Sequence, residues 1–256
     1  MFTDRAALTS RAYADHRALG ARLSIYRYQV NGVDLPGLAL EAMRGVRGAV
    51  LDAGCGLGTY VERLRQDRPD LDVLPLDLSA GMAPAVVADI QRLPLGDSSV
   101  QAALAMHMLY HVPDIAAAAA ELRRVVVEGG VVLASTNGSD DKQEIGALWA
   151  TAVEDLTGSP AQERDPDSRF TLDDGDLLSG AFSSVDVTVF ERETLVPEVE
   201  PVVAFIESMR GLGEQDLPAG LAWDVFLDRV RELVQTEIER CGVFRIGNQV
   251  GMFVCR

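Results

Sequence analysis

The stretch Ala49-Val50-Leu51-Asp52-Ala53-Gly54-Cys55-Gly56-Leu57-Gly58-Thr59-Tyr60 determines the fold expected of this chain. An apolar run of strand length enters a glycine-rich turn, and a segment able to form a helix follows. The glycines allow the backbone to bend tightly and to approach a ligand with no Cβ in the way. This order is typical of a nucleotide pocket at the carboxyl end of a parallel strand. The spacing departs from the G-x-G-x-x-G of dinucleotide sites because residue 59 is Thr.

Two further expected strands carry a carboxylate at their carboxyl ends. Residues 72–77 read as a strand that ends on Asp77, 23 residues after Gly54. A ribose-binding acid belongs at about this distance in such folds. Residues 85–90 read as a third strand, with Asp89 near its end. Either acid alone is as well explained by a loop cap, but the order and spacing of the two after the glycine turn predict a cofactor pocket.

The sequence motif D-x-G-C-G-x-G at residues 52–58 resembles motif I of the class I S-adenosylmethionine (SAM)-dependent methyltransferases. The segment 77–82 is similar to a second sequence motif of that family. Residues 106–114 resemble a histidine-containing motif of the family members that methylate small molecules. The resemblance covers most of residues 45–136. It implies an α/β fold with a Rossmann-like, doubly wound, seven-stranded sheet. The strands near 185–194 and 249–255 are expected to form an antiparallel edge, and helical insertions to form a lid.

The same resemblance implies how the cofactor is held. Asp77 is expected to accept hydrogen bonds from both ribose hydroxyls, Asp89 to bond the adenine amino group, and Ile90 to pack on the ring. Arg27 is expected near the cofactor carboxylate, with a tyrosine near the methyl group; a core aromatic pair with a surface arginine is an equal alternative. The expected cofactor-binding residues are Asp52, Gly54, Cys55, Gly56, Asp77, Leu78, Met82, Asp89, Ile90, Met106, Arg27 and Tyr28.

His107 is the candidate catalytic residue, because it lies just past the expected strand at 100–105. An unperturbed imidazole titrates near pH ~6.5 and can act as a general base. The alternative is a histidine that positions SAM or caps the following helix. His111 is expected to pack or cap, and Cys55 is interpreted as a small packing residue rather than a nucleophile.

Composition limits the possible partners. The formal net charge is −16 and the pI is about 4.5, which opposes binding to nucleic-acid phosphates. No apolar run reaches the ~18 residues of a membrane-spanning helix, and the N-terminus lacks the apolar segment of a signal peptide. Three widely spaced cysteines predict neither a disulfide framework nor a metal site, so a reducing cytoplasm is the expected setting. Lys142, the only lysine, is interpreted as a sign of coding bias rather than of function.

The whole chain is predicted to be one methyltransferase domain. Residues 1–44 form an N-terminal helical cap, 45–136 the SAM-binding core, and 137–170 and 197–240 the lid and substrate segments. Strand–helix alternation in the core predicts a parallel sheet covered on both faces. Trp149 and Trp223 lie in the two lid segments, where they either line an apolar substrate pocket or pack a core.

The predicted function is methyl transfer from SAM to a small-molecule or peptidic acceptor, with S-adenosylhomocysteine as the product. O- and N-methylation both remain open, and bacterial secondary metabolism is the expected context. One alternative is a SAM-binding scaffold without activity, and another is an RNA methyltransferase. The charge opposes the RNA alternative, as does Met106, which stands where exocyclic-amine methyltransferases begin an N-P-P-Y motif. The sequence does not predict an oligomeric state.

Overall fold

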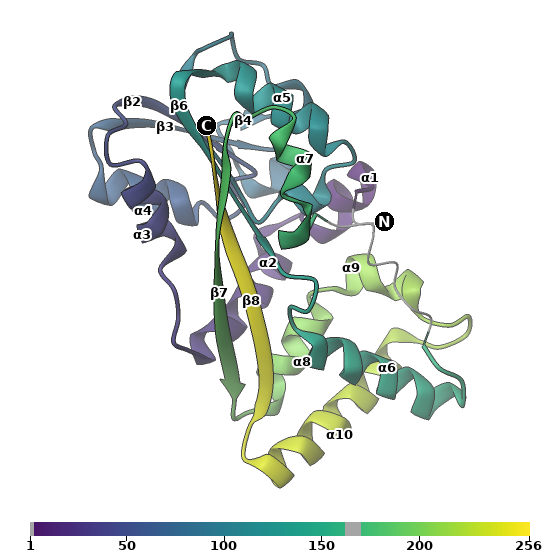
Figure 1. Cartoon of the computed structure of the whole chain (residues 1–256). Helices are drawn as coiled ribbons and strands as arrows, with labels where there is room; N and C mark the ends of the chain where they lie inside the picture. Colours follow the sequence, from purple (N-terminus) through teal and green to yellow (C-terminus); the bar gives the residue numbers. More distant parts are fainter. Residues whose placement is uncertain (1–2, 162–169) are drawn as a thin grey trace.

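One mixed β-sheet organises the molecule (Figure 1). The computed structural model describes residues 3–161 and 170–256. Within these residues, eight strands follow the order β1-β7-β8-β6-β5-β2-β3-β4. The parallel strands are β2 (Gly48–Ala53), β3 (Leu71–Asp77), β4 (Val86–Val87), β5 (Val100–Met106) and β6 (Val126–Asn137). The antiparallel strands are β7 (Val185–Val196) and β8 (Phe244–Cys255), with β1 (Gln29–Val30) on the edge of β7.

The seven expected strands and the antiparallel edge are therefore confirmed, and the two-residue β1 adds an eighth strand. Helices cover both faces of the parallel part. The cluster that contains Met43, Val61 and Leu64 packs α3 (Leu35–Ala42) and α4 (Thr59–Asp67) on one face. The cluster that contains Leu122 and Leu178 packs α5 (Ile115–Val125) and α7 (Asp176–Ser179) on the other.

Strands β7 and β8 span 12 residues each, as β6 does, and the far halves of β7 and β8 support a second layer of helices (Figure 1). This helical layer consists of α6 (Gln143–Thr157), α8 (Val199–Glu207), α9 (Arg210–Gly213) and α10 (Trp223–Cys241). It corresponds to the predicted lid segments. Part of the first segment, residues 162–169, lies outside the described residues. That the layer acts as a lid stays a prediction.

The aromatic side chains of the helical layer pack against one another. Trp149 and Trp223 are 7% and 2% exposed, and both contact Phe226 with ring centroids 4.4 and 5.4 Å away. They share a cluster with Ile246 of β8, so they fix α6 and α10 to the sheet. Of the two interpretations of these tryptophans, the structure supports the packed core.

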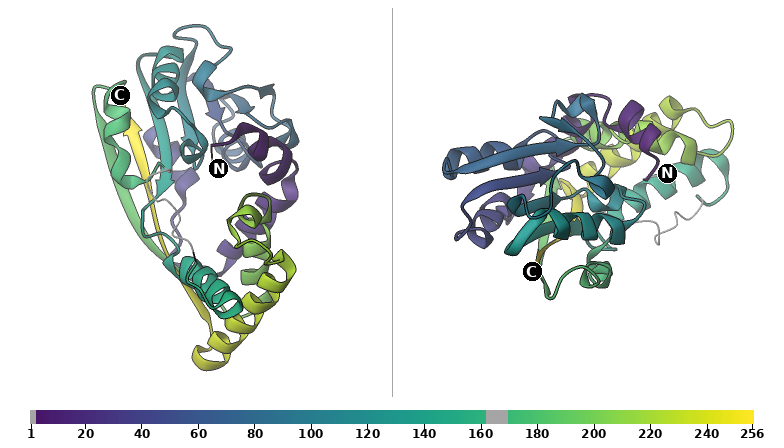
Figure 2. Two further views of the ribbon diagram at one scale, coloured as in Figure 1. Left: turned by 90° about the vertical axis from the view of Figure 1, so that its right-hand side faces the viewer. Right: turned by 90° about the horizontal axis from the view of Figure 1, so that it is seen from above.

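The N-terminal helices lie between the parallel core and the helical layer (Figure 2). They are α1 (Arg5–Ala7), a π-helical turn (Leu8–Ala12) and α2 (His16–Ser24). The N-terminal helical cap is therefore not one continuous helix, because the chain breaks at residues 13–15. The break brings the Tyr13 carbonyl to the Ser79 hydroxyl at 2.7 Å. It also brings the Ala14 carbonyl so close to Gly81 that a Cβ there would lie 2.2 Å from it.

Two strand expectations also need correction. The third strand, expected over 85–90, is reduced to Val86–Val87, because Asp89 leaves the sheet to cap a 3-10 turn at Ile90–Arg92. The final strand is longer than the expected 249–255, because β8 begins at Phe244 and continues through Gly247 and Asn248. Its pairing with β7 runs without interruption through both residues.

Candidate cofactor and acceptor site

The glycine turn joins β2 to α4 in a strained but well-bonded loop. Gly54, Gly56 and Gly58 have φ angles of +76°, +52° and +80°, a backbone region that favours glycine. The Gly54 and Cys55 N–H groups both donate to the Leu76 carbonyl, at 2.7 and 3.0 Å. These bonds fasten the loop to the end of β3, so that Asp77 lies directly beside it.

Asp77 is held in place by backbone donors on both of its oxygens. The Gly56 N–H donates to Oδ2 at 3.0 Å, and the Ser79 N–H donates to Oδ1 at 2.8 Å. Each carboxylate oxygen has a second lone pair, so both can still accept a hydrogen bond. Burial raises the pKa of Asp77, while the N–H groups of Ser79 and Gly56 oppose that shift. A fixed carboxylate with two free acceptor positions suits the vicinal hydroxyls of a ribose.

Asp52 is the most unusual polar group of the site. The residue is 1% exposed, and Oδ2 has no hydrogen-bond partner among the described residues. Burial, and then the charge of Asp77, raise the pKa of Asp52 to about 7. A buried carboxylate without a partner is costly, so this position fits a cationic or hydrogen-bond-donating ligand group.

Cys55 lies in the same loop and is half-buried. Burial and the charges of Asp52 and Asp77 raise the pKa of its thiol to about 12. The thiol therefore stays protonated at neutral pH and makes a poor nucleophile. This agrees with its interpretation as a packing residue.

The N-terminal segment lies over the part of the site where the adenine ring is expected. Asp89 accepts a hydrogen bond from the Gln91 N–H at 3.0 Å, and Arg5 Nη1 lies 2.9 Å from its Oδ2. Ile90 and Met82 are buried, and Leu78 packs on the cluster formed by Ala7, Leu8, Ala12 and Leu212. Roles in adenine binding stay predictions for Leu78, Met82, Asp89 and Ile90.

The other expected ligands differ in their accessibility. Met106 is buried in the core beside β2 and α4. Arg27 is exposed and donates to the Tyr28 hydroxyl at 2.7 Å, whereas Tyr28 packs against the helical-layer cluster. The arginine that reaches inward is Arg22, which donates to the Tyr13 hydroxyl at 3.2 Å and to the Ser208 carbonyl at 3.0 Å. Cofactor roles for Met106, Arg27 and Tyr28 stay predictions, and Arg22 is not among the expected residues.

His107 follows β5 in a left-handed backbone conformation, with φ of +53°. Its N–H donates to both the carbonyl and the hydroxyl of Ser135, at 3.0 Å each. Burial, followed by the positive charges of Lys142 and Arg192, lowers the pKa of His107 to about 4. The ring is therefore neutral at physiological pH. His111 contacts the Tyr13 hydroxyl through Nε2 at 2.7 Å, so it joins the N-terminal segment to the site.

Comparison with known proteins identifies the family. A family described as "Methyltransferase domain" matches residues 51–134, which contain the glycine loop, Asp77 and His107. Malonyl-[acyl-carrier protein] O-methyltransferase of Erwinia billingiae is 30% identical over 193 residues, which cover 72% of this chain and 71% of that enzyme. The chain belongs to the class I SAM-dependent methyltransferases. Like other members, this methyltransferase uses SAM as donor for a small-molecule acceptor and releases S-adenosylhomocysteine.

Further relatives define how far the likeness extends. The enzyme of the same name from Serratia marcescens is 36% identical over 110 residues, which cover 39% of this chain and only 42% of that enzyme. A Bacillus halodurans structure solved as a candidate methyltransferase shares the fold, with a TM-score of 0.57 and 15% identity over 88% of this chain and 99% of its own. Phosphoethanolamine N-methyltransferase 2 of Haemonchus contortus has a TM-score of 0.54 and 16% identity, over 100% of this chain and 59% of its own.

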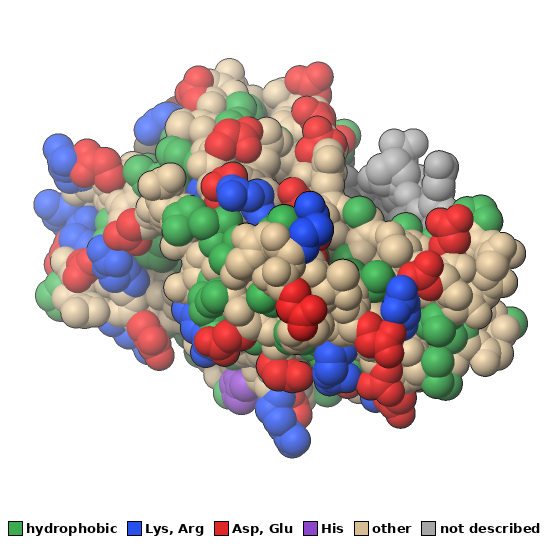
Figure 3. Space-filling view, turned by 90° about the horizontal axis from the view of Figure 1, so that it is seen from below, with side chains coloured by type: hydrophobic (Ala, Val, Ile, Leu, Met, Phe, Trp, Pro, Cys, Tyr) green, Lys and Arg blue, Asp and Glu red, His purple; other side chains and the backbone are tan. Residues whose placement is uncertain are grey.

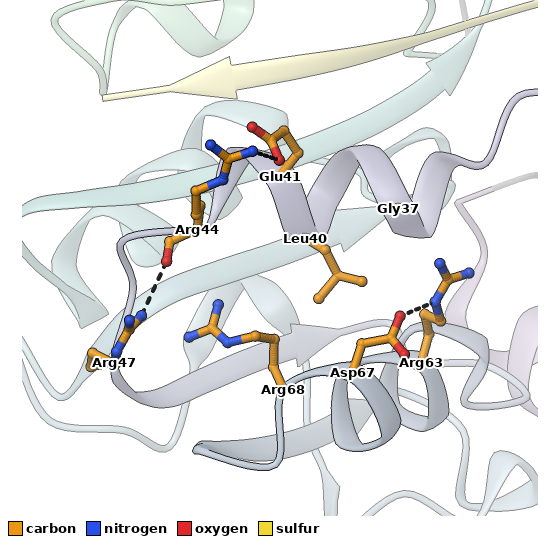
Figure 4. A pocket seen from close by; sticks show the side chains of 8 residues that line it. All are labelled: Gly37, Leu40, Glu41, Arg44, Arg47, Arg63, Asp67 and Arg68. Carbon is orange, nitrogen blue, oxygen red and sulfur yellow. Dashed lines mark hydrogen bonds and ion pairs between the residues drawn. The ribbon is translucent and has the colours of Figure 1, made fainter.

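The surface of the methyltransferase mixes charges of both signs. The face in Figure 3 carries acidic and basic side chains side by side. A hollow of about 440 Å³ between α3 and α4 is lined by Arg44, Arg47, Arg63 and Arg68 (Figure 4). These arginines bond to Glu41, Asp67 and Asp70 and to backbone carbonyls. The guanidinium groups that line the hollow are therefore already paired, and the hollow is a solvated surface rather than a phosphate-binding patch. None of the described helices has the length and apolar character to cross a membrane.

The glycine loop gives a direct test of the cofactor site. We expect Gly54→Ala to destabilise the protein by ~1–3 kcal/mol and to weaken SAM binding, because its Cβ would lie 2.8 Å from Met108 Cγ in a left-handed backbone. Gly58→Ala is the matched control, since Gly58 has a similar φ but its Cβ would meet only Val61, at 4.0 Å. Calorimetric SAM titration and thermal unfolding measure both variants. Equal losses in the two variants would show that the contact with Met108 is unimportant.

Proposed function

We propose that this methyltransferase transfers the methyl group of SAM to an oxygen that is already ionised when the acceptor binds, such as a carboxylate on a small acyl group. Two named relatives are O-methyltransferases of a malonyl group, which carries a free carboxylate. The observation that carries the proposal is the neutral, partly buried His107, which directly follows the carboxyl end of β5. A base with a pKa near 4 has little capacity to deprotonate an alcohol or an ammonium group.

The residues around the glycine loop fit the cofactor. Asp77 would hold the ribose hydroxyls through its two free acceptor positions, and Asp52 would place a buried negative charge beside the cationic part of the molecule. When bound, SAM supplies an electrophilic methyl group on a sulfonium, which an electron pair of the acceptor attacks in line. The chain then contributes mainly by orientation and by the exclusion of water. His107, whose backbone N–H is bonded to Ser135, would line the acceptor path with a neutral imidazole.

The acceptor group is tested with three thioesters of pantetheine that differ only at the far end of the acyl chain. Malonyl, 3-hydroxypropionyl and β-alanyl thioesters present a carboxylate, a hydroxyl and an amine. We expect release of S-adenosylhomocysteine with the malonyl thioester and at least ~100-fold less with the other two. Faster turnover of the hydroxyl or amine compound would contradict the proposal.

Substitution of His107 distinguishes this mechanism from general-base catalysis. We expect His107→Gln to retain turnover of the malonyl thioester within about tenfold, because a carboxylate needs no proton removed. A general base contributes ~100-fold or more. Steady-state rates, together with SAM affinity by calorimetry, give the result. A loss of 100-fold with unchanged SAM affinity would restore His107 as the catalytic base.

The named relatives act on a malonyl group attached to an acyl-carrier protein. We therefore propose a carrier-bound acyl group as the partner class for this chain. A comparison of kcat/KM for the carrier-bound and the pantetheine-bound malonyl group tests the point. Equal values for the two forms would show that the chain recognises the acyl group alone.

A further inference from the structure

Two partly buried cations lie where β7 and β8 run past the end of β6. Lys142 caps the start of α6 with φ of +61°, and its N–H donates to the Gly247 carbonyl of β8 at 3.0 Å. Arg192 of β7 pairs with Asn248, the next residue of β8. The sheet register therefore brings the only lysine of the chain beside a central arginine of β7, although 50 residues separate them in sequence.

Arg192 has less hydrogen bonding than its burial requires. Its Nε–H is buried without a partner among the described residues, and Nη1 donates only a long bond of 3.3 Å to Gln29 Oε1. No carboxylate of the described residues lies within 4.0 Å of the guanidinium. Burial lowers the pKa of Arg192, which reflects the cost of the charge. A partly buried guanidinium whose Nε–H has no partner is stabilised by a ligand that supplies an anion.

Lys142 has a partner, but that partner is shared. Lys142 forms an ion pair with Asp141, and the two side chains are only 15% and 7% exposed. Asp141 also accepts a bond from the Gln249 N–H at 3.1 Å and contacts the Asn248 amide at 3.4 Å. Burial opposes the charge of Lys142, but Tyr26 and Asp141 still raise its pKa. Asp141 is thus the ion-pair partner of Lys142, and Glu144 accepts a hydrogen bond from the Gly247 N–H at 3.0 Å. Arg192 is left without an ion pair among the described residues.

The two cations lie near the end of β6, the strand that also fixes the backbone of His107. Lys142 follows the last residue of β6 by five positions, and the His107 N–H donates to Ser135 of that strand. Lys142 and Arg192 are the two charges that act on His107, and Arg192 also acts on Tyr60 in the first turn of α4. Tyr60 is in turn influenced by Asp52 of the glycine loop, and burial raises the pKa of its phenol. The phenol is therefore neutral and offers a hydrogen-bond donor. In the sheet, the cluster on β7 and β8 is separated from β5, which ends before His107, by β6 alone, and α4 follows the next strand, β2.

We propose that Lys142 and Arg192 form an anion-binding subsite that holds the carboxylate of the methyl acceptor, with Tyr60 as a neutral neighbour. This inference rests on the proposed function and assigns its acceptor group to named residues. The net charge of −16 does not oppose it, because surface charges are screened over ~8–10 Å whereas a buried contact acts at short range. Methylation converts the carboxylate into a neutral ester, so the subsite binds substrate more tightly than product and favours product release.

Malonate and malonamide provide a test that does not need turnover. The two probes are similar in size, but only malonate is charged at pH 7.5. Calorimetric titration of the S-adenosylhomocysteine-loaded protein should detect malonate and bind malonamide at least ~10-fold more weakly, as expected for charge-assisted bonds. Arg192→Gln and Lys142→Met should each weaken malonate binding by about tenfold or more. Affinity for S-adenosylhomocysteine should not change.

Two further variants make the test decisive. Arg245→Gln removes an exposed arginine of β8 that pairs with Glu193, and it should leave malonate binding unchanged. Arg192→Lys keeps the charge and should retain part of the affinity if Arg192→Gln does not fold. Equal binding of malonate and malonamide, or unchanged malonate affinity in folded Arg192→Gln and Lys142→Met, would overturn the subsite. If malonate binding depends on both cations but the malonyl thioester is not turned over, the subsite stands and only the proposed function fails.

Discussion

Asp77→Ala should weaken SAM binding by ~2–4 kcal/mol, or about 30- to 1,000-fold, while the protein remains folded. The variant removes the carboxylate that we expect to accept both ribose hydroxyls, and charge-assisted hydrogen bonds contribute ~1.5–3 kcal/mol each with incomplete additivity. It also leaves the Gly56 and Ser79 N–H groups without their acceptor, which loosens the glycine loop. Titration calorimetry with SAM and with S-adenosylhomocysteine measures the loss.

Two variants separate the ribose contact from general effects. Asp77→Asn keeps one acceptor oxygen and the side-chain shape, so its loss should be smaller than that of Asp77→Ala. Asp72→Ala removes an exposed acid from the same strand and should bind SAM normally. Unchanged SAM affinity in a folded Asp77→Ala variant would show that the ribose site lies elsewhere.

The parts of the fold that depend on local sequence were predictable. Residues 49–60 combine an apolar run, three glycines and a helix start, and each of these signals acts within a few residues. The strand that ends on Asp77 carries the same kind of local information. The antiparallel edge followed from the resemblance rather than from local patterns. The break at residues 13–15 was not predictable, because it depends on a close approach to Gly81, which is distant in sequence.

The proposed anion-binding subsite of Lys142 and Arg192 could not be predicted from the sequence. Lys142 was interpreted as coding bias, and Arg192 is one charged residue in an alternating strand. Their significance depends on the register of β7 with β8, which places Arg192 opposite Asn248. One signal was available: a single lysine beside an aspartate, near the start of the first predicted lid segment, is unusual in a chain that otherwise uses arginine. Arg22, rather than Arg27, reaches inward because its position on α2 directs its side chain toward Tyr13 and Ser208.

Asp52→Asn should stabilise the ligand-free protein at pH 8 and at the same time weaken SAM binding. The pKa of Asp52 rises from 3.8 to about 7 on folding, so the folded state binds a proton more tightly than the unfolded state. The stability linked to this proton is fully present below pH 3.8 and is lost as pH rises to about 7. At pH 8 the ionised Asp52 therefore costs on the order of 2–4 kcal/mol, which the neutral amide avoids.

The difference in unfolding free energy between Asp52→Asn and the wild type should thus grow from pH 4 to pH 8, and denaturant unfolding at several pH values measures it. Asp72→Asn, an exposed acid on the neighbouring strand, should show no such growth. SAM should raise the stability of the wild type more than that of Asp52→Asn at pH 8, because a cationic ligand group compensates the buried carboxylate. The same pH dependence in both proteins would show that Asp52 is not the strained acid of the site. A gain in stability without a loss of SAM affinity would instead place the cofactor's positive charge away from Asp52.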